Sequence, residues 1–332
     1  MRLKTNFSLY LLIFCVTTFL PNSSRSSPPE AKFLWGFYGH KLINRLAVFS
    51  LPPSMGVFYK KHIARITRNA VNPDKRRYAV EGEAERHYLD ADVYGDSAVY
   101  KLPRYWYAAV DSLSEDTLRA YGIAPWHAYF TYLQLIKAFE NKNEPQILAI
   151  SADLGHYLAD ANVPLHTTEN YNGQLSNQKG IHGLWESRLP ELYSHNYRLW
   201  VGKASYIQNP QLYIWQGLIQ AHEALDSVFR FEKEATLELG EDKKWAYEER
   251  NGQIVKTYSR TFSERYHHKL GNQVERQMKA SVKMVADLWY TAWVNAGQPD
   301  LSSVEEFSDE DMQHLEEEDL RWQHQEHELI RN

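Results

Sequence analysis

SADLGHYLADANVPLHTTENYNGQLSNQKGIHGLWE, residues 151–186, contains two pairs of a histidine and an acidic residue at one spacing. His156 precedes Asp160 by four residues, and His182 precedes Glu186 by the same interval. In a helix this spacing places both side chains on one face, with their Cβ atoms about 5–6 Å apart. Converging imidazole and carboxylate groups are ligands that zinc prefers. We therefore expect two metal-binding helix faces in this stretch.

The segment between the two pairs interrupts the helix. Proline disfavours helical backbone at the residue before it, so Asn162-Val163-Pro164 predicts a helix end. The break lets His166 turn back toward the same pocket. One such pair is usually a surface hydrogen bond, because short motifs often match by chance. Two pairs with a histidine between them favour a metal site.

Composition limits the class of protein. The 332 residues are 43% hydrophobic and 14% aromatic, enough for one sizeable core or two modest ones. Residues 301–332 hold 11 acidic and 2 basic residues, and because the whole chain carries -5, the other 300 residues carry +4. A nearly neutral body lacks the basic footprint of a tight duplex-DNA binder, but contact with a phosphodiester in a small site stays open.

The N-terminal region is typical of a secretory signal. Arg2 and Lys4 precede an apolar run at 7–20, which is too short for a comfortable membrane span. We expect residues 1–30 to be a signal peptide and spacer, and the mature protein to be exported, periplasmic or secreted, without a transmembrane anchor. The single cysteine, Cys15, lies in this region, so any metal must be held by His, Asp, Glu or backbone groups.

Helical periodicity dominates the remaining chain. We expect helices at 40–49, 53–68, 104–118, 126–141, 210–231 and 261–295, and one that begins at Pro145, carries His156 and ends at the break at 162–164. Strand signals are scarce, and we interpret the Asn-Gly pairs at 172–173 and 251–252, and Asn-Pro-Asp at 72–74, as turns. These features predict an all-α fold: a single-domain multi-helix bundle over 31–300, followed by a solvated or disordered acidic tail at 301–332.

Further candidate ligands stand upstream of the central stretch. His40 is the last residue of WGFYGH at 35–40. Asp74 follows Asn72-Pro73, and His87 is the first residue of His-Tyr-Leu-Asp at 87–90. The full set is too large for one zinc ion and suits two or three. Its eight members are His40, Asp74, His87, His156, Asp160, His166, His182 and Glu186.

With these residues the chain resembles the superfamily of zinc-dependent phospholipases C and single-strand-specific zinc nucleases. The most specific part is His156-x₃-Asp160-x₅-His166 followed by His182-x₃-Glu186. The resemblance covers about residues 35–190, with a compatible helical remainder to about residue 300. It implies an all-α fold with a trinuclear zinc cleft, so three Zn²⁺ ions are the expected cofactors.

The resemblance also implies which residues hold each ion. The first zinc would be held by Asp74, His87, His156 and Asp160. The second would be held by His166, His182 and Glu186. The third would be held by Trp35, His40 and Asp160, with Asp160 bridging. In the family the counterpart of Trp35 is the mature N-terminus and binds zinc through its amine and carbonyl groups.

The activity implied is that of a hydrolase, a zinc-dependent phosphodiesterase that uses a zinc-bound hydroxide. No side-chain nucleophile is then needed, in keeping with a chain that has no cysteine outside the N-terminal region. Asp90 is a candidate catalytic residue that orients the nucleophilic water or a ligand histidine. A helix-surface carboxylate is the other interpretation of Asp90.

Two substrate classes remain open. WGFYGH at 35–40 resembles the nuclease branch, whereas Glu186 resembles the phospholipase branch. Tyr88 and Tyr171 could stack on bases or surround a choline group. The first motif has no acidic residue to pair with choline, which favours an endonuclease acting on single-stranded nucleic acid over a phospholipase C acting on phosphatidylcholine-like lipids. We expect no stable protein partner.

Other classes fit less well. A di-iron carboxylate bundle needs two Glu-x-x-His pairs, and the chain has one, Glu264 to His267. A non-catalytic zinc-binding module is the further alternative, which would keep its metal coordination closed, whereas an enzyme needs an open position for water.

Overall fold

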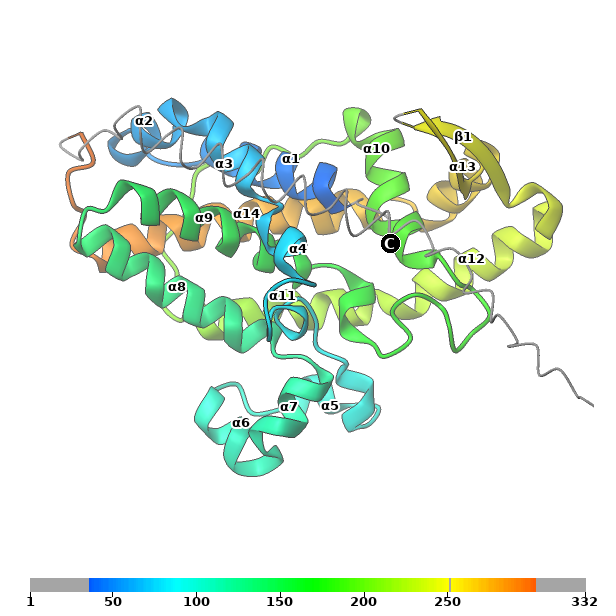
Figure 1. Ribbon diagram of the computed structural model, residues 1–332, viewed down its shortest axis with the longest axis horizontal. Helices are drawn as coiled ribbons and strands as arrows, with labels where there is room; N and C mark the ends of the chain where they lie inside the picture. The colour runs from blue at the N-terminus through cyan, green and yellow to red at the C-terminus, as the bar shows by residue number, and fades with distance from the viewer. Residues whose placement is uncertain (1–35, 251, 303–332) are drawn as a thin grey trace, which may run out of the picture. The chain divides into compact units, whose positions relative to one another are not determined.

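The computed structural model describes residues 36–250 and 252–302. The predicted signal peptide at 1–30, Trp35 and nearly all of the acidic tail lie outside the described residues. The described part is mostly α-helical, as predicted (Figure 1). None of its helices is both long and apolar enough to cross a membrane.

The helices alternate with short 3₁₀ segments, labelled η, and η4 is a π-helical segment. In chain order the elements are α1 (Gly36–Val48), α2 (Pro53–Lys61), α3 (Ile63–Asn69), α4 (Asn72–Arg76), η1 (Ala84–Arg86), η2 (Ala91–Tyr94), α5 (Ala98–Lys101), α6 (Trp106–Leu113), α7 (Glu115–Tyr121), α8 (Ala124–Glu140), α9 (Glu144–Asp160), η3 (Pro164–Thr167), η4 (Gly183–Arg188), α10 (Leu189–Tyr193), η5 (Ser194–Asn196), α11 (Pro210–Glu223), α12 (Leu225–Leu239), η6 (Glu241–Lys243), β1 (Trp245–Arg250), β2 (Gln253–Tyr258), α13 (Arg260–Leu270) and α14 (Gln273–Asn295).

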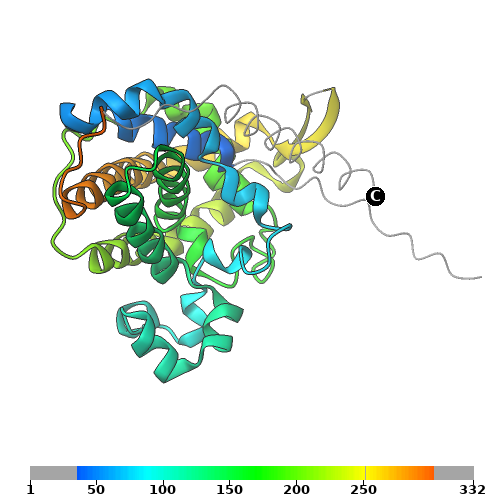
Figure 2. The ribbon, with the colours of Figure 1, turned by 60° about the vertical axis from the view of Figure 1, so that its left-hand side comes forward.

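Helix α9 lies at the centre of the main core, packed against α8, α14, α3 and α1 (Figures 1 and 2). The indole of Trp289 on α14 donates to the Ser151 carbonyl at 3.0 Å and stacks on Tyr59 at 5.1 Å. Tyr59 in turn shares a 2.8 Å hydrogen bond with the Ser151 hydroxyl. Because Ser151 lies before the His156 pair on α9, these contacts fix the helix that carries the central motif.

A smaller apolar cluster lies apart from the main core. Trp126 of α8 and Trp215 of α11 meet edge to face at 5.1 Å between ring centroids. Helices α5, α6 and α7 supply apolar residues to this cluster, and both views show them to one side of the long helices (Figures 1 and 2).

The ends of α9 follow the predicted signals. Asn143 caps its start by accepting a 3.1 Å hydrogen bond from the Gln146 amide, and Pro145 lies in the first turn. The helix ends at Asp160, and Val163 is extended before Pro164. The predicted break is confirmed, and η3 then carries His166.

Four predicted helices are each divided in two. The divisions fall at His62, Ser114, Ala224 and the pair 271–272. Ser114 has φ of 67° and its hydroxyl caps α7, while Gly271 has φ of 60°, a region that glycine enters without strain. Apolar periodicity did not show these breaks. An interruption of one or two residues hardly changes the spacing of apolar residues along the sequence, so the two helices look like one.

One turn prediction was wrong. Asn72-Pro73-Asp74 opens the short helix α4, where proline suits the first turn. Gly252, between β1 and β2, is in a turn as predicted, but the two strands pair antiparallel from Trp245 with Tyr258 to Arg250 with Gln253 and form a hairpin. This hairpin was missed because its strands are charged and their apolar residues do not alternate cleanly. Arg188 donates to Glu248 of β1 at 2.9 Å and so ties the hairpin to η4.

We expect Gly155→Ala to lower the free energy of unfolding by about 1–3 kcal/mol, because it overpacks the contact between α9 and α1. A Cβ at Gly155 would lie 2.0 Å from Oδ1 of Asn44. Gly39→Ala is the matched control, since the nearest atom to its Cβ would be 4.0 Å away. Denaturant unfolding of the metal-free proteins measures both, and equal stability of the two variants would contradict this packing argument.

Candidate metal centre

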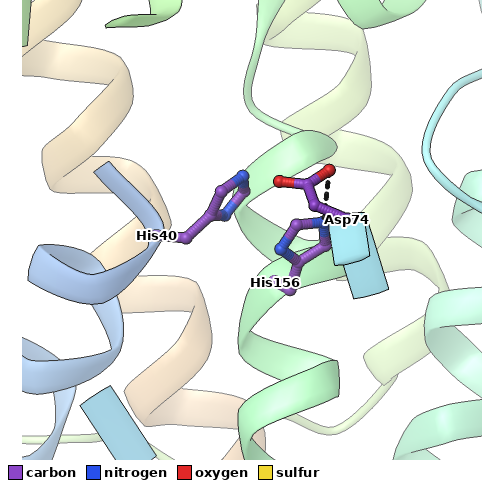
Figure 3. A group of neighbouring side chains, drawn as sticks. All are labelled: His40, Asp74 and His156. Atoms are coloured by element: carbon purple, nitrogen blue, oxygen red, sulfur yellow. Dashed lines mark ion pairs between the residues drawn. The ribbon is translucent and has the colours of Figure 1, made fainter. Parts of the chain in front are cut away.

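The eight predicted ligands lie close together in the structure, although they come from seven separate positions along the chain. They lie on α1, α4, the residue after η1, α9, η3, the residue before η4, and η4. Figure 3 shows three of them, with His40 approaching from α1 and Asp74 and His156 facing each other. The His40 and His156 rings stack with centroids 3.9 Å apart.

The side chains form four overlapping groups that could each hold a metal ion. In each group, one nitrogen or oxygen per residue lies within 4.8 Å of the others. The groups are His40, Asp74 and His156; His87, His156 and Asp160; His166, His182 and Glu186; and His40, Asp160 and Glu186.

The Asp160 carboxylate joins two of these groups and is 1% exposed. Its Oδ2 lies 2.9 Å from Nδ1 of His87 and 3.3 Å from Nε2 of His156. Its Oδ1 lies 3.3 Å from Nε2 of His40. The two oxygens therefore face different sets of imidazoles, which is the arrangement of a carboxylate that bridges two cations.

Glu186, like Asp160, belongs to two of the four groups. Its Oε2 lies 2.7 Å from Nε2 of His182 and 3.5 Å from Nε2 of His166, while Oε1 lies 3.6 Å from Nε2 of His40. The predicted α-helical pair here is in fact at the start of the π-helical η4. Single π-helical turns are often found at functional sites, and this one keeps the pair on one side of the helix.

Backbone carbonyls orient three of the histidines. Nδ1 of His156 lies 2.9 Å from the Ala70 carbonyl oxygen, and Nδ1 of His166 lies 2.5 Å from that of His87. A 3.2 Å contact with the Tyr171 carbonyl does the same for His182. A proton on Nδ1 leaves the Nε2 lone pair free to face the centre, as in metal-binding histidines.

The electrostatics of the centre fit divalent cations. Burial alone would raise the pKa of Asp160, but the imidazoles of His156 and His166 hold that pKa well below its usual value. Burial opposes protonation of His156 and His166, yet the Asp160 charge raises the pKa of each to about 9. Protons thus neutralise the buried carboxylates here, a task that a metal ion can take over.

The pattern of unsatisfied atoms also suits a metal. Oδ1 of Asp160 and Nε2 of His166 are buried and make no hydrogen bond with any residue that the structure describes. Buried polar atoms are rarely left in this state, so each such atom calls for an explanation. Nitrogen and oxygen donors in groups of three or more match the preferences of zinc. The residues therefore fit a metal ion such as zinc.

The remaining predicted residues differ in their relation to the centre. Tyr171 is 50% exposed and meets the His182 ring edge to face at 5.9 Å. Tyr88 is partly buried, and its carbonyl accepts from the Ala124 amide at 3.1 Å. Burial raises the pKa of Asp90 to about 7, and the charge of Asp92 adds to the shift.

One acidic residue near the centre was missed by the sequence reasoning. Glu83 is fully buried, and its Oε1 lies 3.8 Å from Nε2 of His87. It precedes His87 by four residues, the same interval that revealed the two pairs in the central stretch. The four-residue spacing was therefore present in the sequence, but with the acidic residue before the histidine.

No protein-family model matches the chain, and no curated protein matches it significantly. The case for a function therefore depends on the geometry of the centre.

We expect Asp160→Asn to remove more bound metal than His182→Ala. The reason is that the oxygens of Asp160 face two groups, whereas His182 belongs to one. Elemental analysis after dialysis against zinc gives the metal content of each variant. If Asp160→Asn kept as much metal as His182→Ala, Asp160 would not join two metal positions.

Proposed function

We propose that this protein is a zinc-dependent phosphodiester hydrolase with a three-zinc centre. The observation that carries the proposal is the buried Asp160 carboxylate, whose two oxygens face separate groups of imidazoles. A protein with one structural zinc needs four ligands and no such bridge. Eight converging donors exceed that need and are typical of a multinuclear hydrolytic site.

The proposed ligand sets are those that the resemblance implies. Asp74, His87, His156 and Asp160 would hold the first ion, and His166, His182 and Glu186 the second. His40 and Asp160 would hold the third together with Trp35. Glu186 also approaches His40, so it is a further candidate for the third ion. Trp35 lies outside the described residues, and its part stays a prediction.

Bound zinc would act as a Lewis acid that lowers the pKa of water and neutralises charge on phosphoryl oxygens. The protein's own contribution would be positioning and proton transfer. Asp90 is the proposed general base, because a carboxyl group with a pKa of about 7 can accept a proton near neutral pH. The exposed ring of Tyr171 beside His182 is the proposed platform for the substrate.

Single-stranded nucleic acid is the proposed substrate, and the protein would act as an exported endonuclease. Support comes from the exposed aromatic face of Tyr171, since every base offers a π-face to stack on it. A phosphatidylcholine-like lipid is the second candidate. It is supported by Glu186, which matches the phospholipase branch at that position, and by the capacity of Tyr171 for a cation–π contact.

We expect zinc-loaded protein to cleave single-stranded RNA or DNA and to leave phosphatidylcholine vesicles intact. Both substrates are assayed side by side, with a chelator control and zinc add-back. Cleavage of lipid alone would transfer the function to phospholipase C. No cleavage by protein that holds its zinc would favour a closed, non-catalytic zinc module.

We expect Asp90→Asn to reduce the turnover rate about 10²–10⁴-fold. A base with a pKa of about 7 is deprotonated above that pH, so the wild-type rate should rise with pH through about 7. The variant should lack this rise. Asp96→Asn, at an exposed aspartate nearby in the chain, is the matched control. An unchanged pH profile in Asp90→Asn would exclude Asp90 as the base.

A further inference from the structure

His87 lies in the centre in the opposite orientation from the three histidines that backbone carbonyls hold. Those three direct Nε2 inward, whereas His87 directs Nδ1 inward. This nitrogen lies 2.9 Å from Oδ2 of Asp160, 3.0 Å from Nε2 of His156 and 3.7 Å from Oδ1 of Asp74. Its place among these donors makes Nδ1 the ligand atom of His87.

The outer nitrogen of His87 faces a carboxylate. Nε2 is buried and makes no hydrogen bond within residues 36–250 and 252–302, and Oε1 of Glu83 lies 3.8 Å away. Neutral imidazole carries one proton, so a ring that gives the Nδ1 lone pair to a cation must carry its proton on Nε2. Glu83 is the carboxylate that the described part of the structure places against that position.

The Glu83 carboxylate is held firmly in its place. Arg86 donates to Oε2 at 2.7 Å, Arg76 donates to Oε1 at 3.3 Å, and the Tyr157 hydroxyl donates to Oε1. Arg76 also donates to Asp153 at 2.9 Å. A buried carboxylate needs such partners, and two arginines keep it charged. Oxygen Oε1 therefore offers His87 a fixed negative acceptor.

We propose that Glu83 is a positioning residue that accepts the Nε2–H of His87 and so fixes the ring with Nδ1 toward the metal. This inference rests on the proposed zinc centre. The other oriented histidines use neutral carbonyl acceptors, whereas the group 3.8 Å from Nε2 of His87 is a charged carboxylate. A carboxylate behind a ligand imidazole makes the imidazole a stronger donor to the metal. Glu83 would therefore raise the affinity of the ion that His87 holds.

A simple salt bridge is the competing explanation, because Glu83 also pairs with two arginines. That role would contribute to folding but would leave the proton position on His87 and the zinc affinity of the folded protein unchanged. The experiments must therefore measure the position of the proton on His87 and the zinc affinity of the folded protein.

The first measurement uses the wild-type protein. In zinc-loaded protein with ¹⁵N-labelled histidine, we expect NMR to show the His87 proton on Nε2, with His156, His166 and His182 protonated on Nδ1. The His87→Gln variant assigns the signal. This measurement needs no Glu83 variant to fold. A proton on Nδ1 of His87 in zinc-loaded protein would overturn the inference.

The second measurement compares Glu83→Gln with Glu85→Gln, at a neighbouring glutamate that pairs with Arg119 instead. Competition against a chromophoric chelator gives zinc affinity, and circular dichroism confirms folding. We expect Glu83→Gln to weaken one of the bound ions about 10–100-fold, and Glu85→Gln to match the wild type.

The outcomes separate this inference from the proposed function. Normal zinc binding by wild type and by folded Glu83→Gln would overturn the role of Glu83 and leave the zinc centre standing. Equal weakening in both variants would also overturn it, since the effect would not be specific to the carboxylate behind His87. Absence of zinc binding by the wild type would overturn the zinc centre, and this inference with it.

Discussion

The buried Asp160 carboxylate is the group on which the centre depends. A lone carboxylate without solvent would be far too costly in free energy, so partners of positive charge must surround it. Those partners come from α1, from the residue after η1, from α9 and from η3, and each element must end or turn at the right residue to supply them. The positions at which these helices end are therefore as important for the geometry of the centre as the candidate ligands themselves.

Contacts with the surrounding core fix the position of α9, which carries Asp160. The Ser151 carbonyl accepts a hydrogen bond from Trp289, and the Ser151 hydroxyl shares one with Tyr59, which lies on a different helix. On the opposite side of the centre, the Arg188 contact with Glu248 secures η4 just beyond Glu186. Packing and ion pairs thus fix both helical segments that carry the histidine–acid pairs.

The five candidate ligands at 156–186 could be predicted because their signals are local, whereas His40, Asp74 and His87 received their roles from the family resemblance. Pairs four residues apart and a proline after a helix can be recognised within one short stretch, and the structure brings these residues together. Breaks such as Ser114 and the hairpin around Gly252 depend on backbone conformations that leave little trace in apolar periodicity. Glu83 has the same four-residue spacing to His87, with the acidic residue first, but its burial and its partners on α4 and α9 become visible only in the structure.

The contact between Trp289 and Ser151 has a consequence for the order of events during synthesis. All predicted ligands precede residue 187, yet the helix that fixes α9 spans Gln273–Asn295. A nascent chain would expose every candidate metal ligand before the pocket that aligns them exists. Contacts of such long sequence separation form late, because closing the intervening loop costs entropy first. Ion capture and final compaction would then be a single late step, completed after α14 has left the ribosome.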